Sequence, residues 1–473
     1  MAELWESGAG ELAELVRSGQ VSCREVVEAH LRRIDEVNGR VNAVTVVLGD
    51  AALAAADRTD RALRRGEAAG PLAGVPMTVK ENIDVAGSAT TLGIVALRDA
   101  VAERDAPHIA ELRAAGAIPI GRGNMPEFGM RWHTGNDLRG VTRNPWSAEH
   151  TAGGSSGGDA AAVAAGMAPL GMGNDGAGSL RWPARCCGVA ALKPSLGRVA
   201  LMGPGSRPAP FAFQLLSVHG PIARRVDDLR LAFAHMCGPG DGDPWYAPVP
   251  LRGPRPAAPL RVAVVTGAGE DEAARDAVRR AAELLTGAGY ETEDRTPPAP
   301  ARAGALHTQI MSAWGRVHEE QPPVETVASE EFARFWAAFE EPWTRAAGER
   351  AFDPMMERAA LVSAWAAWMA ETPLILAPVC GRPPFRIGAD LDPEWLAGWP
   401  AALRVTVAAN LLGLPAVTVP TGRSGDLPEA VQIIGPRFRE DLCLDAAAAV
   451  ESAIPPLTPV TPREGRPGQP TEE

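Results

Sequence analysis

The sequence predicts a single large α/β domain. Helical segments, glycine breaks and short apolar strands follow one another along most of the chain, which is the order found in α/β folds. With 46% hydrophobic and 22% charged residues, the 473-residue chain has enough apolar material for one large core. No internal repeat divides the sequence. We therefore assign residues 1–455 to one domain and the proline-rich, polar residues 456–473 to a flexible tail.

The first predicted elements are helices followed by strands. Residues 8–36 alternate apolar and polar positions at helical spacing and are interrupted at Gly19, which predicts two helices, the second beginning near Ser22. Residues 41–48 (VNAVTVVL) are rich in β-branched side chains and predict a strand, which an Ala/Arg-rich helix follows. The stretch GVPMTVK then predicts a short buried strand that ends at Lys80.

The later elements repeat this order. Residues 108–124 and 158–175 each predict a helix, a glycine stop and a buried strand. Residues 261–294 predict a further unit of strand and helix, and residues 373–379 and 415–420 predict apolar strands.

Residues 302–400 differ in composition from the rest of the chain because they are rich in tryptophan. We expect most of these aromatic side chains to belong to a helical layer over the sheet and some of them to border the substrate entrance. The tryptophans of this region are Trp314, Trp336, Trp343, Trp365, Trp368, Trp395 and Trp399.

Composition excludes several classes of protein. A net charge of −12 and the lack of a basic run argue against a nucleic-acid surface. The chain contains no long uncharged apolar stretch that predicts a membrane span, and its acidic first residues are unlike a secretory signal. Six cysteines without a CxxC pair predict reduced thiols and no zinc site. We therefore expect a cytoplasmic protein without nucleic-acid or membrane partners.

Lysine is rare in this chain. Of the 46 basic side chains only two are lysines, Lys80 and Lys193. Arginine can replace a lysine that only supplies charge, but it cannot supply an amine that loses its proton inside a protein. Lys80 is therefore a candidate base. Lys193 precedes a proline and fits equally well as a packed side chain.

The run GGSSGGD, residues 153–159, allows several interpretations. By composition it resembles a flexible linker. It also matches the G-x-S-x-G nucleophile elbow, but that motif needs a late histidine and the last histidine here is His318. A phosphate-binding loop needs Lys-Ser/Thr after the last glycine, where this chain has Asp159. The remaining interpretation is a serine that is activated by a neutral lysine.

A second glycine-flanked serine, Ser179 in GNDGAGS, lies 24 positions after Ser155. The small residues Gly176, Ala177 and Gly178 would let consecutive backbone N–H groups converge on one point, which is the geometry of an oxyanion hole. Together these segments supply a base, a relay hydroxyl, a nucleophile and anion-binding amides.

These motifs stand in the order found in a known family. The chain resembles the amidase signature family in GVPMTVKENIDVAG, GGSSGGDAAAVAAG and GNDGAGSLRWPARCCGVAALKPSLGRV, and further in GPIARRVDDLRLAF and NLLGLPAVTVPTG. The similarity covers most of residues 5–450. It implies an α/β/α domain with a central mixed sheet flanked by helices. It also implies an amidase that works through a Ser-cisSer-Lys triad and an acyl-enzyme, with no metal or organic cofactor.

Position by position, the resemblance implies a role for each motif residue. Ser179 is then the nucleophile, Ser155 the serine that follows a cis peptide bond, and Lys80 the base. The backbone amides of Gly176, Ala177, Gly178 and Ser179 form the oxyanion hole.

Supporting and binding residues follow from the same resemblance. Asp175 and Arg181 correspond to a pair that braces the nucleophile loop, for which a structural ion pair is the favoured interpretation. Ser156 either positions its neighbour or fills a polar turn. Substrate-binding residues are expected within residues 302–400 and around four positions: Met125, Gly129, Met130 and Trp132. The partner is a small-molecule amide. Many relatives are homodimers, and the oligomeric state of this chain stays open.

Three departures from the family pattern bear on the site. Asn174 replaces a threonine, Asp159 a frequent serine, and Ala177 a glycine, which would be costly if that position required a positive φ. Three functions are open at this point. The leading one is hydrolysis of a small or medium carboxamide. The others are acyl transfer or amide formation, including the role of a glutamine-hydrolysing component of an amidotransferase, and a non-catalytic binding role.

Overall fold

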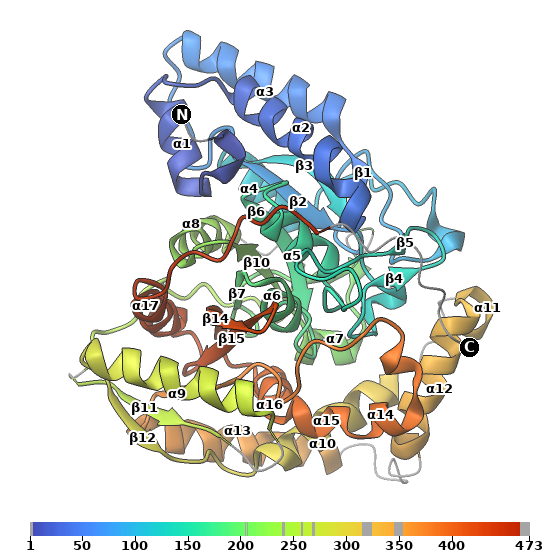
Figure 1. The fold of residues 1–473 in the computed structure, drawn as a ribbon, viewed down its shortest axis with the longest axis vertical. Helices are drawn as coiled ribbons and strands as arrows, with labels where there is room; N and C mark the ends of the chain where they lie inside the picture. Colours follow the sequence, from blue (N-terminus) through green and yellow to red (C-terminus); the bar gives the residue numbers. More distant parts are fainter. Residues whose placement is uncertain are drawn as a thin grey trace.

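The computed structural model describes residues 3–203, 205, 207–238, 242–256, 259–266, 270–314, 324–344 and 353–463. They are organised around one eleven-stranded sheet (Figure 1). From one edge to the other the strands are β1 (Val44–Val47), β3 (Ile118–Gly123), β2 (Pro76–Lys80), β6 (Leu170–Asp175), β10 (Val218–Ala223), β7 (Ala190–Lys193), β14 (Ala416–Ser424), β15 (Leu427–Ile434), β13 (Leu374–Pro378), β11 (Arg261–Val264) and β12 (Glu291–Asp294).

The sheet is mixed. β2 runs parallel to β3 and β6, and β11 runs parallel to β12 and β13, whereas the other neighbours are antiparallel. One continuous sheet spans the sequence from β1 to β15. The prediction of a single α/β domain with a central mixed sheet is therefore confirmed.

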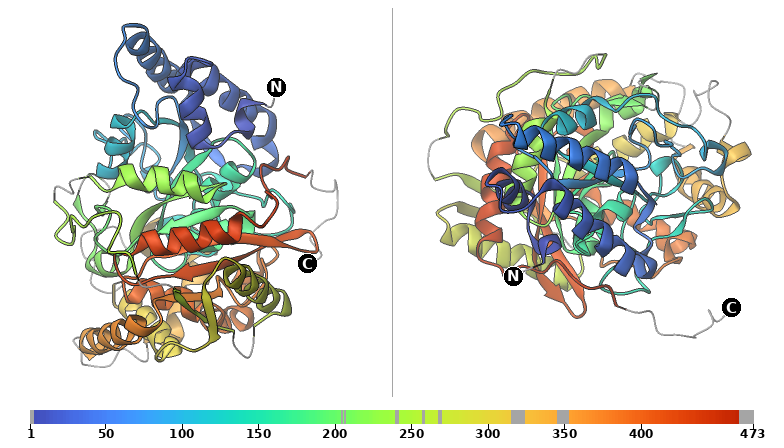
Figure 2. Two further views of the ribbon diagram at one scale, coloured as in Figure 1. Left: turned by 90° about the vertical axis from the view of Figure 1, so that its left-hand side faces the viewer. Right: turned by 90° about the horizontal axis from the view of Figure 1, so that it is seen from above.

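Helices cover both faces of the sheet, and β2 illustrates how the faces differ. Met77 and Val79 point into one core layer, and Thr78 and Lys80 point to the opposite face because side chains alternate along a strand. The helices that pack on the first layer are α4 (Pro107–Ala114), α8 (Val226–Met236), α9 (Glu272–Gly287) and α17 (Glu440–Glu451). Figure 2 shows α8 and α17 side by side on that face.

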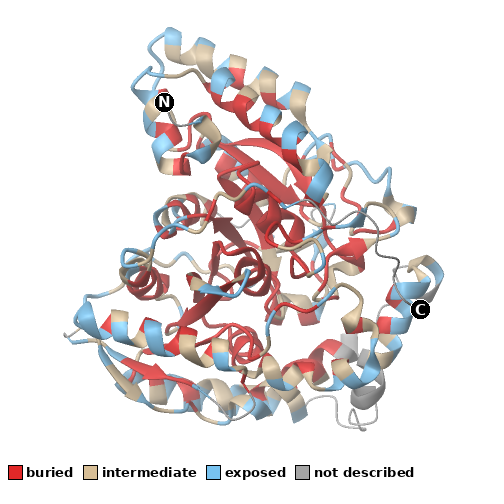
Figure 3. Cartoon of the chain, viewed as in Figure 1, coloured by how far each residue is buried: buried red, intermediate tan, exposed pale blue. Residues whose placement is uncertain are grey.

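The opposite face carries the functional motifs. Near β2 it is covered by α2 (Cys23–Val41), α3 (Gly49–Arg64), α5 (Gly157–Ala164) and α6 (Arg181–Cys187). Toward β13 it is covered by α7 (Phe211–Leu216), α10 (Pro300–Trp314), α13 (Asp353–Glu371) and α16 (Arg404–Leu411). Every residue of α5 is buried, so this short helix lies inside the domain rather than on its surface (Figure 3).

Most predicted elements are present at the expected positions. The N-terminal segment forms α1 (Ala9–Arg17) and α2, with the break at Gly19, whose φ is 71°. Ser22 caps α2 by accepting a hydrogen bond from the amide of Glu25. In the large sheet the structure adds three strands that the sequence did not predict, β7, β10 and β15. β10 contains Pro221 between two paired neighbours, a position where proline is unusual.

The tryptophan-rich region forms α10 and α13 together with α11 (Val324–Val327), α12 (Glu330–Thr344), α14 (Pro393–Ala397) and α15 (Trp399–Ala402). Trp365 and Trp399 are buried in the core, whereas Trp336, Trp368 and Trp395 are partly buried. The side chains of Trp314 and Trp343 lie outside the described part of the chain.

The C-terminal segment is described as far as Arg463. The amide of Val460 donates to the carbonyl of Ala164 at 2.8 Å, and Arg33 donates to Thr461. Residues 456–463 therefore contact the domain, in contrast to the flexible tail predicted for residues 456–473. The remaining ten residues lie outside the described part. Among the helices that the structure describes, none has the length and apolarity needed to cross a membrane.

Candidate active site

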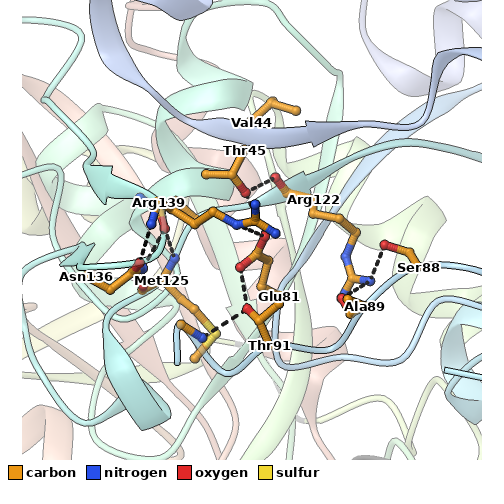
Figure 4. Close-up of polar contacts among 12 residues, drawn as sticks. Val44, Thr45, Glu81, Ser88, Ala89, Thr91, Arg122, Met125, Asn136 and Arg139 are labelled. Atoms are coloured by element: carbon orange, nitrogen blue, oxygen red, sulfur yellow. Dashed lines mark hydrogen bonds and ion pairs between the residues drawn. The ribbon is translucent and has the colours of Figure 1, made fainter. Parts of the chain in front are cut away.

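Lys80 ends β2 with its backbone fixed by a buried polar network. The guanidinium of Arg122 donates to the carbonyls of Val79, Lys80 and Ile83, and also to Ser88 and Ala89. These bonds connect β2 and β3 to the loop that follows Lys80. Figure 4 shows the bonds from Arg122 to Ser88 and Ala89. The position of the lysine is thus set by backbone contacts on both sides.

The residue after Lys80 is held equally firmly. The buried carboxylate of Glu81 accepts hydrogen bonds from Thr45 at 2.8 Å, Thr91 at 2.5 Å and Arg139 at 2.9 Å (Figure 4). A paired buried carboxylate of this kind restrains the chain. Lys80 is therefore supported by rigid structure rather than by a loose loop.

The amine of Lys80 contacts two polar groups. Nζ lies 2.6 Å from Oγ of Ser155 and 2.6 Å from Oδ1 of Asn174, to which it donates. Ser155 precedes α5, and Asn174 lies near the end of β6. Because these distances correspond to strong hydrogen bonds, the lysine and the serine form one polar pair.

Ser155 and Ser179 are brought together by their two glycine-rich loops. The peptide bond between Gly154 and Ser155 is cis, as the family resemblance implied. The amide of Ser156 donates to the carbonyl of Ser179 at 3.2 Å, which joins the loops directly. Oγ of Ser156 also donates to the carbonyl of Asn174 at 3.3 Å, so this serine helps to hold the loops together.

Asp175 and Arg181 form the predicted ion pair, with Nε of Arg181 2.9 Å from Oδ2 of Asp175. Burial alone would raise the pKa of the Asp175 carboxyl, but the charge of Arg181 and its hydrogen bonds hold that pKa below its ordinary value. Arg181 also donates to Gln432 and Asn410 on β15 and α16. The pair therefore anchors the loop that carries Ser179 to β15 and α16.

The loop between β6 and α6 differs in one respect from the predicted oxyanion hole. The amide of Gly178 donates to Oδ1 of Asp175 at 2.7 Å, so of the four amides that we assigned to the hole this one already has a partner within the loop. Within the described residues no hydrogen bond engages the amides of Gly176, Ala177 and Ser179. These three amides are the ones free to bind an anion.

Two side chains outside the motif orient this loop. Nε2 of His307, on α10, lies 2.6 Å from the carbonyl oxygen of Gly176, and Nε1 of Trp132 donates to the carbonyl of Ala177 at 3.2 Å. The positive φ in the loop, 99°, belongs to Gly178, so Ala177 does not adopt the conformation that would penalise a Cβ atom.

The two serines open into a cavity lined mainly by apolar side chains. Three of the four predicted binding residues, Gly129, Met130 and Trp132, line it, whereas Met125 does not and is fully buried behind Gly129. Met311 lies within residues 302–400, as expected, but the sequence did not predict the part of the lining that comes from other segments, including Asn82, Leu201, Met202, Phe213, His219, Leu403 and Val407.

Burial lowers the pKa of Lys80 to about 7, although the charges of Asp159 and Asp175 act in the opposite direction. Burial and the charge of Arg181 also lower the pKa of Lys193 to about 7. However, Nζ of Lys193 donates to the carbonyl of Pro194 and to neither serine. Geometry, rather than basicity, therefore distinguishes Lys80 as the base candidate.

Comparison with known proteins identifies the family to which the chain belongs. A model of the amidase family matches residues 25–444. The chain belongs to the amidase family. It is 39% identical to an indoleacetamide hydrolase of Bradyrhizobium diazoefficiens over 458 residues, covering 95% of this chain and 87% of that protein. It is 33% identical to a 6-aminohexanoate-cyclic-dimer hydrolase of Pseudomonas over 492 residues, covering 96% of each chain.

Solved structures agree with this assignment. The 6-aminohexanoate cyclic dimer hydrolase matches with a TM-score of 0.83 at 30% identity, covering 98% of this amidase and 99% of that chain. A bacterial aryl acylamidase of the amidase signature family matches with a TM-score of 0.81 at 27% identity, covering 96% and 97% of the two chains. The predicted family and fold are confirmed, and the protein is an enzyme that hydrolyses carbon–nitrogen bonds of amides.

Proposed function

We propose that this amidase cleaves carboxamides through a serine acyl-enzyme in which Ser179 is the nucleophile, Ser155 the proton relay and Lys80 the base. The contact of 2.6 Å between Nζ of Lys80 and Oγ of Ser155 is the observation that carries this proposal. A serine next to a neutral, buried amine is a recognised means of nucleophile activation.

The proposed reaction begins with two linked proton transfers. Oγ of Ser179 attacks the amide carbonyl while its proton passes to Ser155, and the hydroxyl proton of Ser155 passes to Nζ of Lys80. The carbonyl oxygen becomes an oxyanion that the amides of Gly176, Ala177 and Ser179 stabilise. The relay then returns a proton to the leaving nitrogen, and water attacks the acyl-enzyme to release the carboxylic acid.

The cavity favours a neutral amide with an aromatic acyl group. Phe128, Trp132 and Phe213 contribute aromatic surface. Arg131 also lines the cavity, but its guanidinium is paired with the carboxylates of Asp390 and Glu331 and is therefore not available to a substrate carboxylate. An arylacetamide, the class to which the substrate named for the indoleacetamide hydrolase belongs, fits this surface.

Acyl transfer to an amine is the second candidate. The chain is 34% identical to a component of the glutamyl-tRNA(Gln) amidotransferase of Moorella thermoacetica over 484 residues, covering 95% of this chain and 97% of that protein. The apolar lining argues against the charged amino acid glutamine as the amide donor. Hydrolysis of a neutral amide therefore has the better support.

The test combines covalent labelling with turnover. Phenylmethanesulfonyl fluoride should add once to the wild-type protein, and intact-mass spectrometry should find no adduct on Ser179→Ala and only a trace on Lys80→Ala. The same variants should fail to hydrolyse phenylacetamide and indole-3-acetamide. Retention of labelling and normal turnover by Ser179→Ala would sink the proposal. Hydroxylamine added as an acceptor separates the two candidates, since a transferase would form the hydroxamate in preference to the acid.

We also propose that the enzyme acts in the cytoplasm. All six cysteines are free thiols, and five of them are buried: Cys23, Cys186, Cys187, Cys380 and Cys443. Chains that keep every thiol reduced are typical of reducing compartments.

A further inference from the structure

The first turn of α5 carries a buried carboxyl group against the strand that ends at Lys80. Asp159 is fully buried, and its Oδ1 accepts a hydrogen bond from Oγ1 of Thr78 at 2.8 Å. Thr78 and Lys80 are two residues apart in β2, so their side chains lie on the same face of the sheet. Asp159 therefore occupies the face on which the base works.

One oxygen of this carboxyl group has no partner. Among the residues that the structure describes, none forms a hydrogen bond with Oδ2 of Asp159. A buried carboxylate oxygen without a partner is costly, and native proteins keep few such groups. The unmatched oxygen indicates that the carboxyl group has a role beyond holding the helix.

The strands on both sides of β2 leave room for this side chain. A Cβ atom on Gly123 of β3 would collide with the carboxyl atoms of Asp159, and one on Gly171 of β6 would lie 3.0 Å from its Cβ. Glycine weakens a strand, and it often marks a place where another group approaches closely. Three adjacent strands thus accommodate the carboxyl group of α5.

We propose that Asp159 is a positioning residue for Lys80. The carboxylate of Asp159 stabilises the ammonium group that forms when Lys80 takes the proton of Ser155. This inference rests on the proposed function, because it assumes that Lys80 is the base. Asp159 itself gains and loses no proton in the step. One proton moves from Ser179 to Ser155 and one from Ser155 to Lys80. When the amine leaves, Ser155 gives a proton to the leaving nitrogen and takes one back from Lys80.

The charged groups around the pair favour this role. The charges of Asp159 on α5 and Asp175 on β6 both raise the pKa of Lys80, and burial lowers the pKa of His219 on β10 so that its ring is neutral. Because Arg181 is 2.9 Å from Asp175, the charge of Asp175 is already offset, and Asp159 is left as the counter-charge for the lysine.

Burial and the neighbouring groups act on the charge of Asp159 in opposite directions. Burial raises the pKa of Asp159 to about 7, while the hydrogen bond from Thr78 and the charges of Lys80 and Arg122 lower it. The first turn of a helix also favours a negative charge. Both groups have a pKa of about 7, so at neutral pH a change in the charge of one changes the protonation of the other.

The experiment measures the rate at which phenylmethanesulfonyl fluoride acylates Ser179 between about pH 5 and 10, a range that covers the titration of the base. Asp159→Asn keeps the shape and removes the charge. We expect its acid limb to move to lower pH by about one unit or more, because an opposite charge raises a lysine pKa by that order. The plateau rate should fall, since the base becomes weaker.

Asp228→Asn is the matched control. Asp228 is another buried carboxyl, on α8, with a pKa raised by burial, and it accepts a hydrogen bond from the amide of Gly10 rather than from the site. Its loss should leave the acid limb in place. This comparison separates a specific effect on Lys80 from a general effect of removing a buried carboxyl.

Thr78→Val decides the matter if Asp159→Asn does not fold. Without the hydroxyl donor the carboxyl is ionised over a narrower pH range, so the acid limb should move in the same direction but by less. A folded variant of either kind whose acid limb coincides with that of the wild type would overturn the proposal. Failure of the proposed function would give a different result from failure of this inference. In that case the wild-type protein itself would form no adduct on Ser179.

Discussion

Oδ1 of Asn174 lies 2.6 Å from Nζ of Lys80, on a strand adjacent to the one that carries the lysine. Removing this acceptor in Asn174→Ala should lower kcat about tenfold with little change in KM, since one hydrogen bond to a charged or reacting amine is worth about 1.5 kcal/mol or somewhat more. Asn174→Asp should instead move the acid limb of kcat to higher pH, because a carboxylate raises the lysine pKa. Steady-state kinetics against pH would test both. Equal effects of the two substitutions would contradict this account of Asn174.

The wild-type enzyme should lose activity as the pH falls through about 7. Burial lowers the pKa of Lys80 to about 7, and the amine can accept a proton only when it is neutral, that is, above this pKa. The measurement is kcat/KM against pH. Lys193→Met is the control, because that lysine has a similarly lowered pKa and contacts neither serine. A shift of the acid limb in Lys193→Met would contradict the prediction, because it would show that Lys193 rather than Lys80 titrates.

His307 should matter for kcat rather than for substrate binding. Burial lowers its pKa to about 4, so the ring is neutral at neutral pH and donates from Nε2 to the carbonyl of Gly176. His307→Leu should reduce kcat about tenfold or more, because a small misplacement of oxyanion donors is costly. His307→Gln, which keeps a donor, should recover part of the loss. If both variants lowered kcat alike, the hydrogen bond would not be the cause.

Arg131 should make a large contribution to stability. Its guanidinium is buried and lies 2.5 Å from Oδ2 of the equally buried Asp390, while Glu331 on α12 is half exposed. Asp390→Ala leaves the arginine with one exposed partner and should cost about 3–5 kcal/mol. Urea denaturation followed by fluorescence would measure the midpoint. In Arg131→Leu combined with Asp390→Leu no buried charge is left unpaired, so a midpoint as low as that of Asp390→Ala would contradict the electrostatic explanation.

Phe213 should influence the choice of acyl group. It lies on α7 and lines the cavity, as do residues 201–203. Phe213→Ala should lower kcat/KM for phenylacetamide about tenfold, which is the usual scale for losing apolar contact in a substrate pocket. The value for propionamide, which is too small to reach the ring, should change little. The ratio of the two specificity constants, measured on one enzyme preparation, is the readout. An unchanged ratio would remove Phe213 from the substrate contacts.

The strands that carry the chemistry were predictable from local pattern. Lys80 ends a short apolar segment, and Ser155 and Ser179 stand in glycine-rich runs whose spacing and order are specific. β10 was not predicted because Gly220 and Pro221 interrupt it, although it lies between β6 and β7 in the sheet. Tertiary pairing overrides local propensity at such positions.

The cavity was harder to predict than the triad. Its lining comes from segments near residues 128–132, 201–219, 304–311 and 400–407. These segments share no periodicity and meet only because the sheet order brings them together. His307 shows the same limit, since nothing in its neighbours along the chain indicates that it contacts Gly176. Asn174 did carry a signal, because it replaces the threonine of the family pattern.

Both lysines are fully buried, which has a practical consequence for labelling. Reagents that acylate primary amines at neutral pH should modify neither side chain while the domain is folded. On unfolding, both amines become accessible at once. The mass added at Lys80 and Lys193 therefore reports the fraction of chains that have opened, without a spectroscopic probe or an engineered tag.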